Sequence, residues 1–239
     1  MRERRRLLLM RHGAVEYFTT DGRPHLPTEV PLTEGGVQQA QAIGSAIAEA
    51  GIAIDRVVTS GLIRTRSTAE HVLAAGKISA PVEHWADLQE IRGGRLGAIP
   101  ETDLRDAFIA PFEGPVPLET RFLGGETVGQ LLDRVVPALQ RLLNQEGWDT
   151  TLLVLHGGVN RALLSWLLTG QRVFFGGFEQ APGCLNVIDV GDSTATNIVR
   201  MINYSPLDAL HTATRQSTME ALLARYRSTR ELRGGEAAR

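Results

Sequence analysis

The chain of 239 residues contains one cysteine, Cys184, and one lysine, Lys77. A single cysteine excludes an internal disulfide and a zinc site built from cysteines. We expect Cys184 to be buried at the start of a strand, because free cysteine behaves as a small hydrophobic residue. Apart from histidine, every other basic residue is arginine. Its planar fork suits phosphate and carboxylate groups, although a GC-rich genome explains the same bias.

Long apolar runs are also absent, since none approaches the roughly 18 residues of a membrane span. The opening MRERRRLLLM imitates a signal peptide, but its apolar part has four residues, against roughly 7–15 in such peptides. We therefore expect a cytoplasmic protein that does not associate with membranes. The formal net charge of −2 favours no nucleic acid partner. Hydrophobic residues at 43% and charged residues at 22% are typical of a globular protein and exclude a disordered one.

Hydrophobic periodicity predicts alternating strands and helices. The expected strands cover residues 5–10, 55–60, 81–85, 151–155, 185–190 and 196–202. The expected helices cover residues 34–50, 62–75, 126–145, a segment ending at about 168, and a tail helix over 214–227. Repeated strand–helix alternation predicts an α/β fold, a three-layer sandwich with a mostly parallel central sheet.

Local signals refine these elements. Thr33 is a good N-cap for the first helix, and Gly51 and Gly76 are placed to end the first and second helices. Pro137 is expected to kink the helix over 126–145. Residues 86–125 are rich in Gly and Pro, which indicates an insertion or lid over one end of the sheet. We expect one domain over 1–239, with a tail over 204–239 whose last residues, RGGEAAR, fray.

Polar residues follow three of the expected strands directly. The strand RLLLM runs into Arg11-His12-Gly13, and TLLVL runs into His156 and Gly157. The strand VVTS leads into a helix that carries Arg64 in its first turn. In parallel sheets, ligands bind beyond the carboxyl ends of the strands. We therefore expect two imidazoles and two guanidinium groups to meet at one place.

These segments, with three others, resemble the histidine phosphatase superfamily, also called phosphoglycerate mutase-like. The RHG signature is present at residues 11–13, and PLTEGGVQQA resembles the family's PLT-x-x-G-x-x-QA helix start. The matching stretches, in family order, are TSGLIRTRSTAE, LQEIRGG, GGET and LHGGVNR. The resemblance implies the phosphoglycerate mutase-like fold and a phosphoryl-transfer activity, with a small phosphorylated metabolite as the partner.

The chemistry of phosphoryl transfer assigns a role to each candidate. A neutral imidazole can attack phosphorus and form a phosphohistidine, and we expect His12 to be this nucleophile. Neighbouring cations would keep His12 neutral. Arg11, Arg64 and His156 would bind the phosphoryl oxygens. The sequence has no carboxylate cluster typical of a two-metal site, so we expect neither a metal nor another cofactor.

The remaining assignments concern the acid and the substrate site. Glu90 matches the family's proton donor, with Glu16, Glu83, Asp87 and Glu101 as alternatives. Gly13 and Gly157 would line the substrate site. Arg92, like Arg95, either reaches a second anionic group or is a solvated loop charge. Glu126 is either a pocket contact or an acidic residue at a helix N-terminus. Four histidines match no motif and are expected to be structural: His25, His71, His84 and His211.

Three functions are compatible with these residues. Mutases of the family usually follow RHG with serine or threonine and then Trp-Asn, whereas this chain has Ala14, Val15, Glu16 and Tyr17. Hydrolysis of a phosphomonoester is therefore the leading hypothesis. A phosphoglycerate mutase-type isomerase and a non-catalytic binder of phosphorylated ligands are the alternatives. The oligomeric state is open, with a homodimer as our hypothesis.

Overall fold

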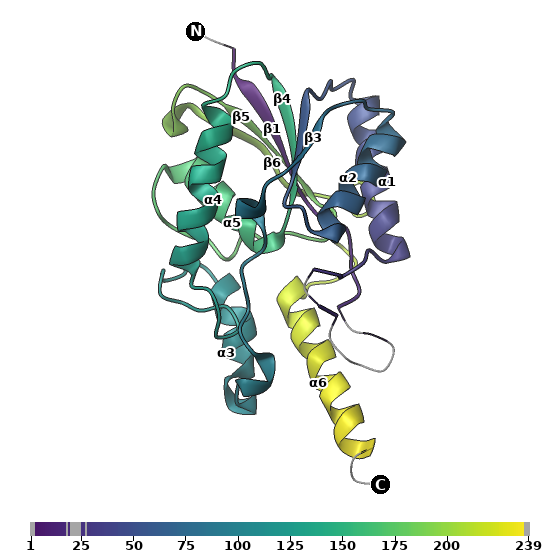
Figure 1. The fold of residues 1–239 in the computed structure, drawn as a ribbon, viewed down its shortest axis with the longest axis vertical. Helices are drawn as coiled ribbons and strands as arrows, with labels where there is room; N and C mark the ends of the chain where they lie inside the picture. Colours follow the sequence, from purple (N-terminus) through teal and green to yellow (C-terminus); the bar gives the residue numbers. More distant parts are fainter. Residues whose placement is uncertain (1–2, 18, 20–24, 27, 237–239) are drawn as a thin grey trace.

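The computed structural model describes residues 3–17, 19, 25–26 and 28–236. Its centre is a six-stranded sheet with the order β3-β2-β4-β1-β5-β6 (Figure 1). The strands are β1 (Arg5–Arg11), β2 (Arg56–Thr59), β3 (Val82–His84), β4 (Thr150–Leu155), β5 (Leu185–Val190) and β6 (Ile198–Tyr204). Strands β1 to β4 pair in parallel, and β5 runs antiparallel to both β1 and β6. The predicted mostly parallel sheet is confirmed.

Six α-helices accompany the sheet among the described residues. They are α1 (Glu34–Glu49), α2 (Ile63–Gly76), α3 (Leu104–Ile109), α4 (Val128–Leu143), α5 (Gly157–Thr169) and α6 (Thr218–Glu236). Short 3₁₀ turns cover Ala86–Leu88, Leu96–Ala98, Glu101–Asp103, Ala110–Phe112 and Thr194–Thr196. None of the helices in the described part of the chain is long and apolar enough to cross a membrane.

Helices cover both faces of the sheet, as the predicted three-layer sandwich requires. Figure 1 shows α1 and α2 on one side and α4 and α5 on the other. Successive residues of a strand point to opposite faces, so Leu7 and Leu9 pack with α4 and α5. Leu8 and Met10 pack with α1 and α2. Strand β1 is thus buried on both faces, which explains its unbroken apolar run.

The N-capping residues set where helices α1 and α4 begin. Thr33 caps α1 as expected, and its Oγ1 accepts from Gly36 N at 3.0 Å. Helix α4 starts later than predicted, because Thr127 is its N-cap and forms a capping box with Gln130. Pro137 lies inside α4, which is continuous to Leu143.

The last helix and the end of α2 also correct the prediction. Helix α6 begins at Thr218 rather than residue 214 and continues to Glu236, into the segment that was expected to fray. Residues 237–239 lie outside the described part of the chain. At the end of α2, the left-handed residue is Lys77, with φ of 51°, whereas Gly76 is the last helical residue.

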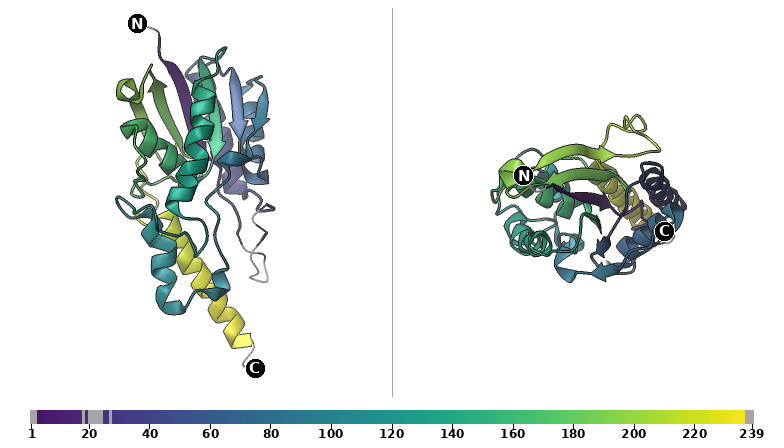
Figure 2. Two further views of the ribbon diagram at one scale, coloured as in Figure 1. Left: turned by 60° about the vertical axis from the view of Figure 1, so that its left-hand side comes forward. Right: turned by 90° about the horizontal axis from the view of Figure 1, so that it is seen from above.

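Residues 86–125 form an arm that packs against α6. Figures 1 and 2 show α3 and α6 extending beyond the sheet at the end away from the N-terminus. Leu104, Phe108 and Ile109 form an apolar cluster with Leu223 of α6. Apolar packing of this kind orders a helix that has little amphipathic pattern of its own.

Cys184 is fully buried immediately before β5, as predicted. Burial raises the pKa of its thiol to about 12. The thiol is therefore protonated and unreactive at neutral pH.

Glycine lets α1 and α2 approach closely. A Cβ on Gly44 would lie 2.3 Å from the carbonyl oxygen of Val72, and a Cβ on Gly76 would lie 2.9 Å from that of Gly44. Neither backbone can yield without separating the two helices. A Cβ on Gly35, at the start of α1, would meet nothing closer than 3.8 Å.

We predict that Gly44→Ala lowers the free energy of unfolding by about 1–3 kcal/mol, because the added methyl group overpacks the helix contact. Gly35→Ala is the matched control in the same helix and is expected to be neutral or stabilising by up to about 1 kcal/mol. Guanidinium denaturation of the two variants and the wild type measures both values. If Gly44→Ala were as stable as the wild type, α1 and α2 would be able to move apart and accommodate a methyl group at no cost in stability, which contradicts the prediction.

Candidate active site

His12 and His156 meet because β1 and β4 are neighbouring parallel strands. Arg11 pairs with Leu155 in register, so the next residue of each strand leaves the same edge of the sheet. The ring centroids of the two histidines lie 5.3 Å apart, with an interplanar angle of 66°. Their exposed fractions are 2% and 0%. The two imidazoles form a buried pair at the carboxyl ends of the strands.

The hydrogen bond of His12 fixes its tautomer. Its Nδ1 lies 2.8 Å from the carbonyl oxygen of Gly13, which can only accept a hydrogen bond. The proton therefore resides on Nδ1, and Nε2 keeps its lone pair. Burial, together with the guanidinium groups of Arg11 and Arg64, holds the pKa of His12 well below its ordinary value. His12 is neutral and has a nucleophilic nitrogen at neutral pH.

A chain of hydroxyl groups fixes the tautomer of His156. Thr65 Oγ1 donates to the carbonyl of Leu62, so Ser60 Oγ donates to Thr65 at 3.0 Å. His156 Nε2 then donates to Ser60 Oγ at 2.8 Å. Burial and the charge of Arg64 hold the pKa of His156 well below its ordinary value.

The second ring nitrogen of His156, Nδ1, is buried without a hydrogen-bond partner. Such a lone pair repels an anion unless the imidazole takes up a proton. A phosphate dianion beside His156 would raise its pKa and convert Nδ1 into a donor.

Two buried arginines surround the histidines. Arg11 and Arg64 are 6% and 5% exposed. Arg11 Nη1 donates to the carbonyl of Gln180 and to Thr218 Oγ1 at 3.0 Å, whereas its Nε is buried without an acceptor. A buried N–H without a partner costs about 1–3 kcal/mol. An anion bound here would supply the missing acceptor.

Glu90 is the acidic candidate that the structure places at this site. Its Oε1 accepts from Ile91 N at 2.9 Å, and its Oε2 accepts from Gly158 N at 3.2 Å in the first turn of α5. Glu90 is also the one carboxylate among the described residues that line the adjoining cavity. The alternatives form ion pairs elsewhere: Glu83 with Arg56, Asp87 with Arg141, Glu101 with Arg227, and Glu16 with Arg225.

Arg134 holds the Glu90 loop in place and was missed by the sequence analysis. Its Nη1 donates to the carbonyl oxygens of Asp87 and Gln89 at 2.8 and 2.7 Å. Its Nη2 forms an ion pair with Glu126 at 2.8 Å. Arg134 lies in the middle of α4, outside every motif, so no local pattern identified it.

The predicted substrate-binding residues divide into two groups. Gly157 and Arg92 line the cavity, while Gly13 and Glu126 are not among its described lining residues. Glu126 instead binds Arg134 and accepts from the backbone N–H of Arg92 at 2.9 Å. A Cβ on Gly13 would lie 2.3 Å from the carbonyl oxygen of Gly36. The close backbone contact with α1 therefore explains why this position needs glycine, without any contact to a substrate.

The cavity next to these groups has a volume of about 410 Å³. Its lining includes Arg11, Arg64, Glu90 and Gly157, together with Thr218, Met219 and Leu222 of α6. Among the described residues, no group of three or more His, Cys, Asp or Glu side chains is arranged to hold a metal ion.

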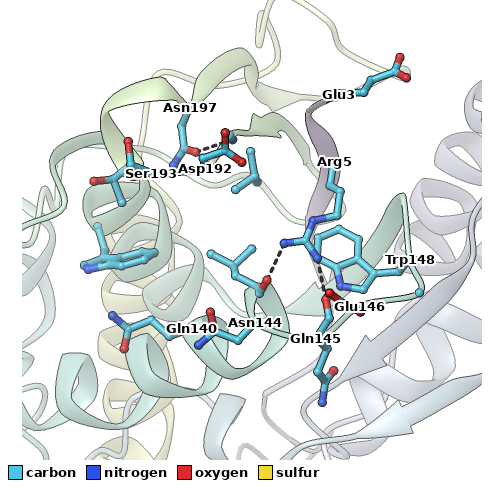
Figure 3. A pocket seen from close by; sticks show the side chains of 16 residues that line it. Glu3, Arg5, Gln140, Asn144, Gln145, Glu146, Trp148, Asp192, Ser193 and Asn197 are labelled. Carbon is cyan, nitrogen blue, oxygen red and sulfur yellow. Dashed lines mark hydrogen bonds between the residues drawn. The ribbon is translucent and has the colours of Figure 1, made fainter. Parts of the chain in front are cut away.

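A second cavity, of about 810 Å³, lies at the opposite ends of β1 and β4 (Figure 3). Arg5 crosses it, with its guanidinium 4.1 Å from the centre of the Trp148 ring. The same group donates to the carbonyl oxygens of Gln145 and Leu143. Its charge is thus engaged within the protein, and the described lining of this cavity contains no histidine that could act as His12 does.

The depressed pKa values of His12 and His156 predict a stability that falls in acid. Below a pH of about 6.5, each of these histidines binds a proton in the unfolded chain but stays unprotonated in the folded protein. The free energy of unfolding then falls by up to about 1.4 kcal/mol per pH unit for each ring. The loss begins near the unfolded pKa and grows as the pH is lowered.

We therefore predict that His12→Gln has a shallower dependence of stability on pH than the wild type, by up to about 1.4 kcal/mol per pH unit. Urea denaturation between about pH 6 and pH 5 measures both slopes. The slope is the readout, so a uniform loss of stability in the variant does not affect the test. Equal slopes would mean that His12 binds a proton in the folded state.

Comparison with known proteins identifies the family. Residues 7–203 match the model of the Histidine phosphatase superfamily (branch 1). The chain is 28% identical over 207 residues to the adenosylcobalamin/alpha-ribazole phosphatase of Escherichia coli K12, covering 83% of this chain and 95% of that protein. It is 31% identical over 164 residues to a metal-independent phosphoserine phosphatase of Arabidopsis thaliana, covering 66% of each.

Other matches agree with this assignment. The chain spans 33% of the length of the rat 6-phosphofructo-2-kinase/fructose-2,6-bisphosphatase 1 that it also matches. The crystal structure of the alpha-ribazole phosphatase from Shigella flexneri superposes with a TM-score of 0.64 at 25% identity, covering 83% of this chain and 96% of that one. The predicted family, fold and enzyme class are confirmed, and the chain belongs to the histidine phosphatase superfamily.

Proposed function

We propose that the protein is a metal-independent phosphatase that hydrolyses a small phosphomonoester through a phosphohistidine on His12. The observation that carries this proposal is the neutral His12, with its Nε2 lone pair, beside two buried arginines. Glu90 lines the cavity that opens next to them and supplies an acid.

In the first step, His12 Nε2 attacks phosphorus and the bond from phosphorus to the ester oxygen breaks. Arg11, Arg64 and a protonated His156 balance the charge on the phosphoryl oxygens. The carboxyl group of Glu90 gives its proton to the departing alcohol. The products are an alcohol, a phosphohistidine and a Glu90 carboxylate.

In the second step, a water molecule attacks the phosphohistidine. The Glu90 carboxylate takes a proton from this water, and the bond between phosphorus and Nε2 breaks. Inorganic phosphate leaves, while His12 returns to its neutral form and Glu90 to its acid form. The cycle needs no further reactant.

Metal independence is supported by the charge already present at the site. Guanidinium groups can stabilise a phosphoryl transition state as bound cations do. The name of the Arabidopsis relative includes the same property. A pure binder of phosphorylated ligands would need the arginines but neither a nucleophile nor an acid, so hydrolysis is favoured over binding alone. A probable phosphoglycerate mutase of Salmonella paratyphi A also matches at 31% identity, but residues 14–17 of this chain depart from the mutase pattern, which favours hydrolysis.

We predict that the purified protein hydrolyses p-nitrophenyl phosphate in EDTA and that His12→Ala lowers kcat by more than about 10³-fold, because the covalent route is lost. Acid-labile radioactive phosphate should be trapped on the wild type and not on His12→Ala. His71→Ala, on α2 and outside the lining of the cavity, is the control and should keep the wild-type rate. Full activity of His12→Ala would refute the proposal.

We also predict that the effect of Glu90→Gln depends on the leaving group. An alkoxide needs a proton, so butyl phosphate should react about 10²–10⁴-fold more slowly. p-Nitrophenolate leaves without taking up a proton, so the rate with p-nitrophenyl phosphate should fall much less. The rate of phosphoenzyme formation is measured in the first turnover by rapid quench, which separates it from the later attack of water.

Glu83→Gln is the control for this experiment, since Glu83 lies on β3 and pairs with Arg56. It should leave both first-turnover rates unchanged. Equal losses on both substrates in Glu90→Gln would assign Glu90 a structural role at the N-terminus of α5 rather than a catalytic one.

A further inference from the structure

The cavity beside the catalytic groups has an apolar side. The arm over 86–125 contributes Leu96, Phe108, Phe112 and Phe122, and α6 contributes Met219 and Leu222. These side chains come from two segments more than ninety residues apart in the sequence. Phosphate itself needs none of them, because its contacts lie with the arginines and histidines at the sheet edge.

The apolar wall is held in place by contacts outside the cavity. The rings of Phe108 and Tyr226 lie 5.8 Å apart. Arg225 forms an ion pair with Glu16 at 2.6 Å, and Arg227 forms one with Glu101 at 3.1 Å. Exposed ion pairs contribute little stability each. The position of α6 is therefore stabilised mainly by buried Leu223 and by the contact between Phe108 and Tyr226.

The start of α6 is tied to the catalytic site as well. Thr218 Oγ1 accepts from Arg11 Nη1 at 3.0 Å and donates to Glu179 Oε1 at 2.9 Å. Residues Met219 and Leu222 follow on the same helix. The apolar wall is therefore continuous with the proposed phosphate site.

Few cations are available for a second anionic group. Arg161 lines the cavity, but its guanidinium donates to the carbonyls of Gly176 and Gly157 and pairs with Glu179 at 2.6 Å. Beyond Arg11 and Arg64, the other basic residues among the described lining are Arg92, which is exposed, and His25, which is half-buried. A substrate with a second phosphate or carboxylate would leave the apolar side unused.

We propose that the substrate is a phosphomonoester of an apolar alcohol, alkyl or aryl, whose hydrocarbon group binds between the 86–125 arm and α6. This inference rests on the proposed phosphatase activity and narrows its substrate class. The cavity volume of about 410 Å³ lies in the usual range for small-molecule sites. A phosphate group with a short polar alcohol is small compared with that volume and would not fill it.

The test is a series of linear alkyl phosphates, ethyl, butyl and hexyl, given to the full-length protein. Transfer of each methylene from water to the apolar wall should raise kcat/KM about fourfold, or on the order of 10² from ethyl to hexyl. Phosphoserine, glycerol phosphate and 3-phosphoglycerate are the polar comparison set. All three should have a lower kcat/KM than hexyl phosphate.

A variant of α6 tests whether the preference for longer alkyl groups comes from the apolar wall. Met219→Gln combined with Leu222→Gln keeps good helix formers and makes the wall polar, so the hexyl-to-ethyl ratio should fall by at least about tenfold. Ala221→Gln, on the exposed face of the same helix, is the matched control and should keep the wild-type ratio.

The outcomes separate the two proposals. Hydrolysis of ethyl and polar phosphates with no gain along the alkyl series overturns the apolar substrate class and leaves the phosphatase in place. A gain that survives the double glutamine change also overturns it, since the wall would then not be the binding surface. Absence of hydrolysis with every phosphate removes the phosphatase and the substrate class together.

Discussion

Positive charge buried at one end of the sheet is the constraint on which the rest of the structure depends. Arg11 and Arg64 are almost fully removed from water, and burial opposes the charge of both the guanidinium groups and any protonated imidazole. Repulsion and desolvation keep His12 neutral and therefore nucleophilic. In the proposed function the same positive charge would attract a dianion, and Arg11 Nε, which is buried without an acceptor, would donate to it. Nucleophilicity and phosphate affinity thus have one electrostatic origin.

The sheet makes this concentration of charge tolerable. Strands β2, β4 and β1 are adjacent, so the residues that follow them must lie together whatever their separation in the sequence. Both faces of β1 and β4 are packed by apolar side chains, and a slip of one residue would turn every side chain to the wrong face. The register is therefore strongly specified. Core packing, which is far from the chemistry, offsets the cost of holding like charges close together.

The site residues that could be predicted from the sequence lie near the ends of parallel strands, because such ends meet at one edge of the sheet. His12, Arg64 and His156 each lie within four residues of the end of an expected parallel strand, which was enough to bring them together. Arg134 could not be found this way, because it reaches the Glu90 loop from the middle of a helix and carries no local signal. Glu126 was left between two interpretations, and only its long-range contact with Arg134 distinguishes them. The extent of α6 was underestimated since its order comes from packing on the 86–125 arm rather than from periodicity.

In the proposed phosphatase, helix α6 would connect recognition of the alcohol with the charge that binds phosphate. Thr218 binds Arg11, and Met219 and Leu222, on the same helix, face the cavity. A hydrocarbon group packed on α6 would press on the element that orients Arg11, so binding energy gained far from phosphorus can be used to hold a catalytic cation. A short polar ester gives α6 nothing to pack against. The arrangement therefore links the size and polarity of the alcohol to the rate of phosphoryl transfer, in addition to affinity.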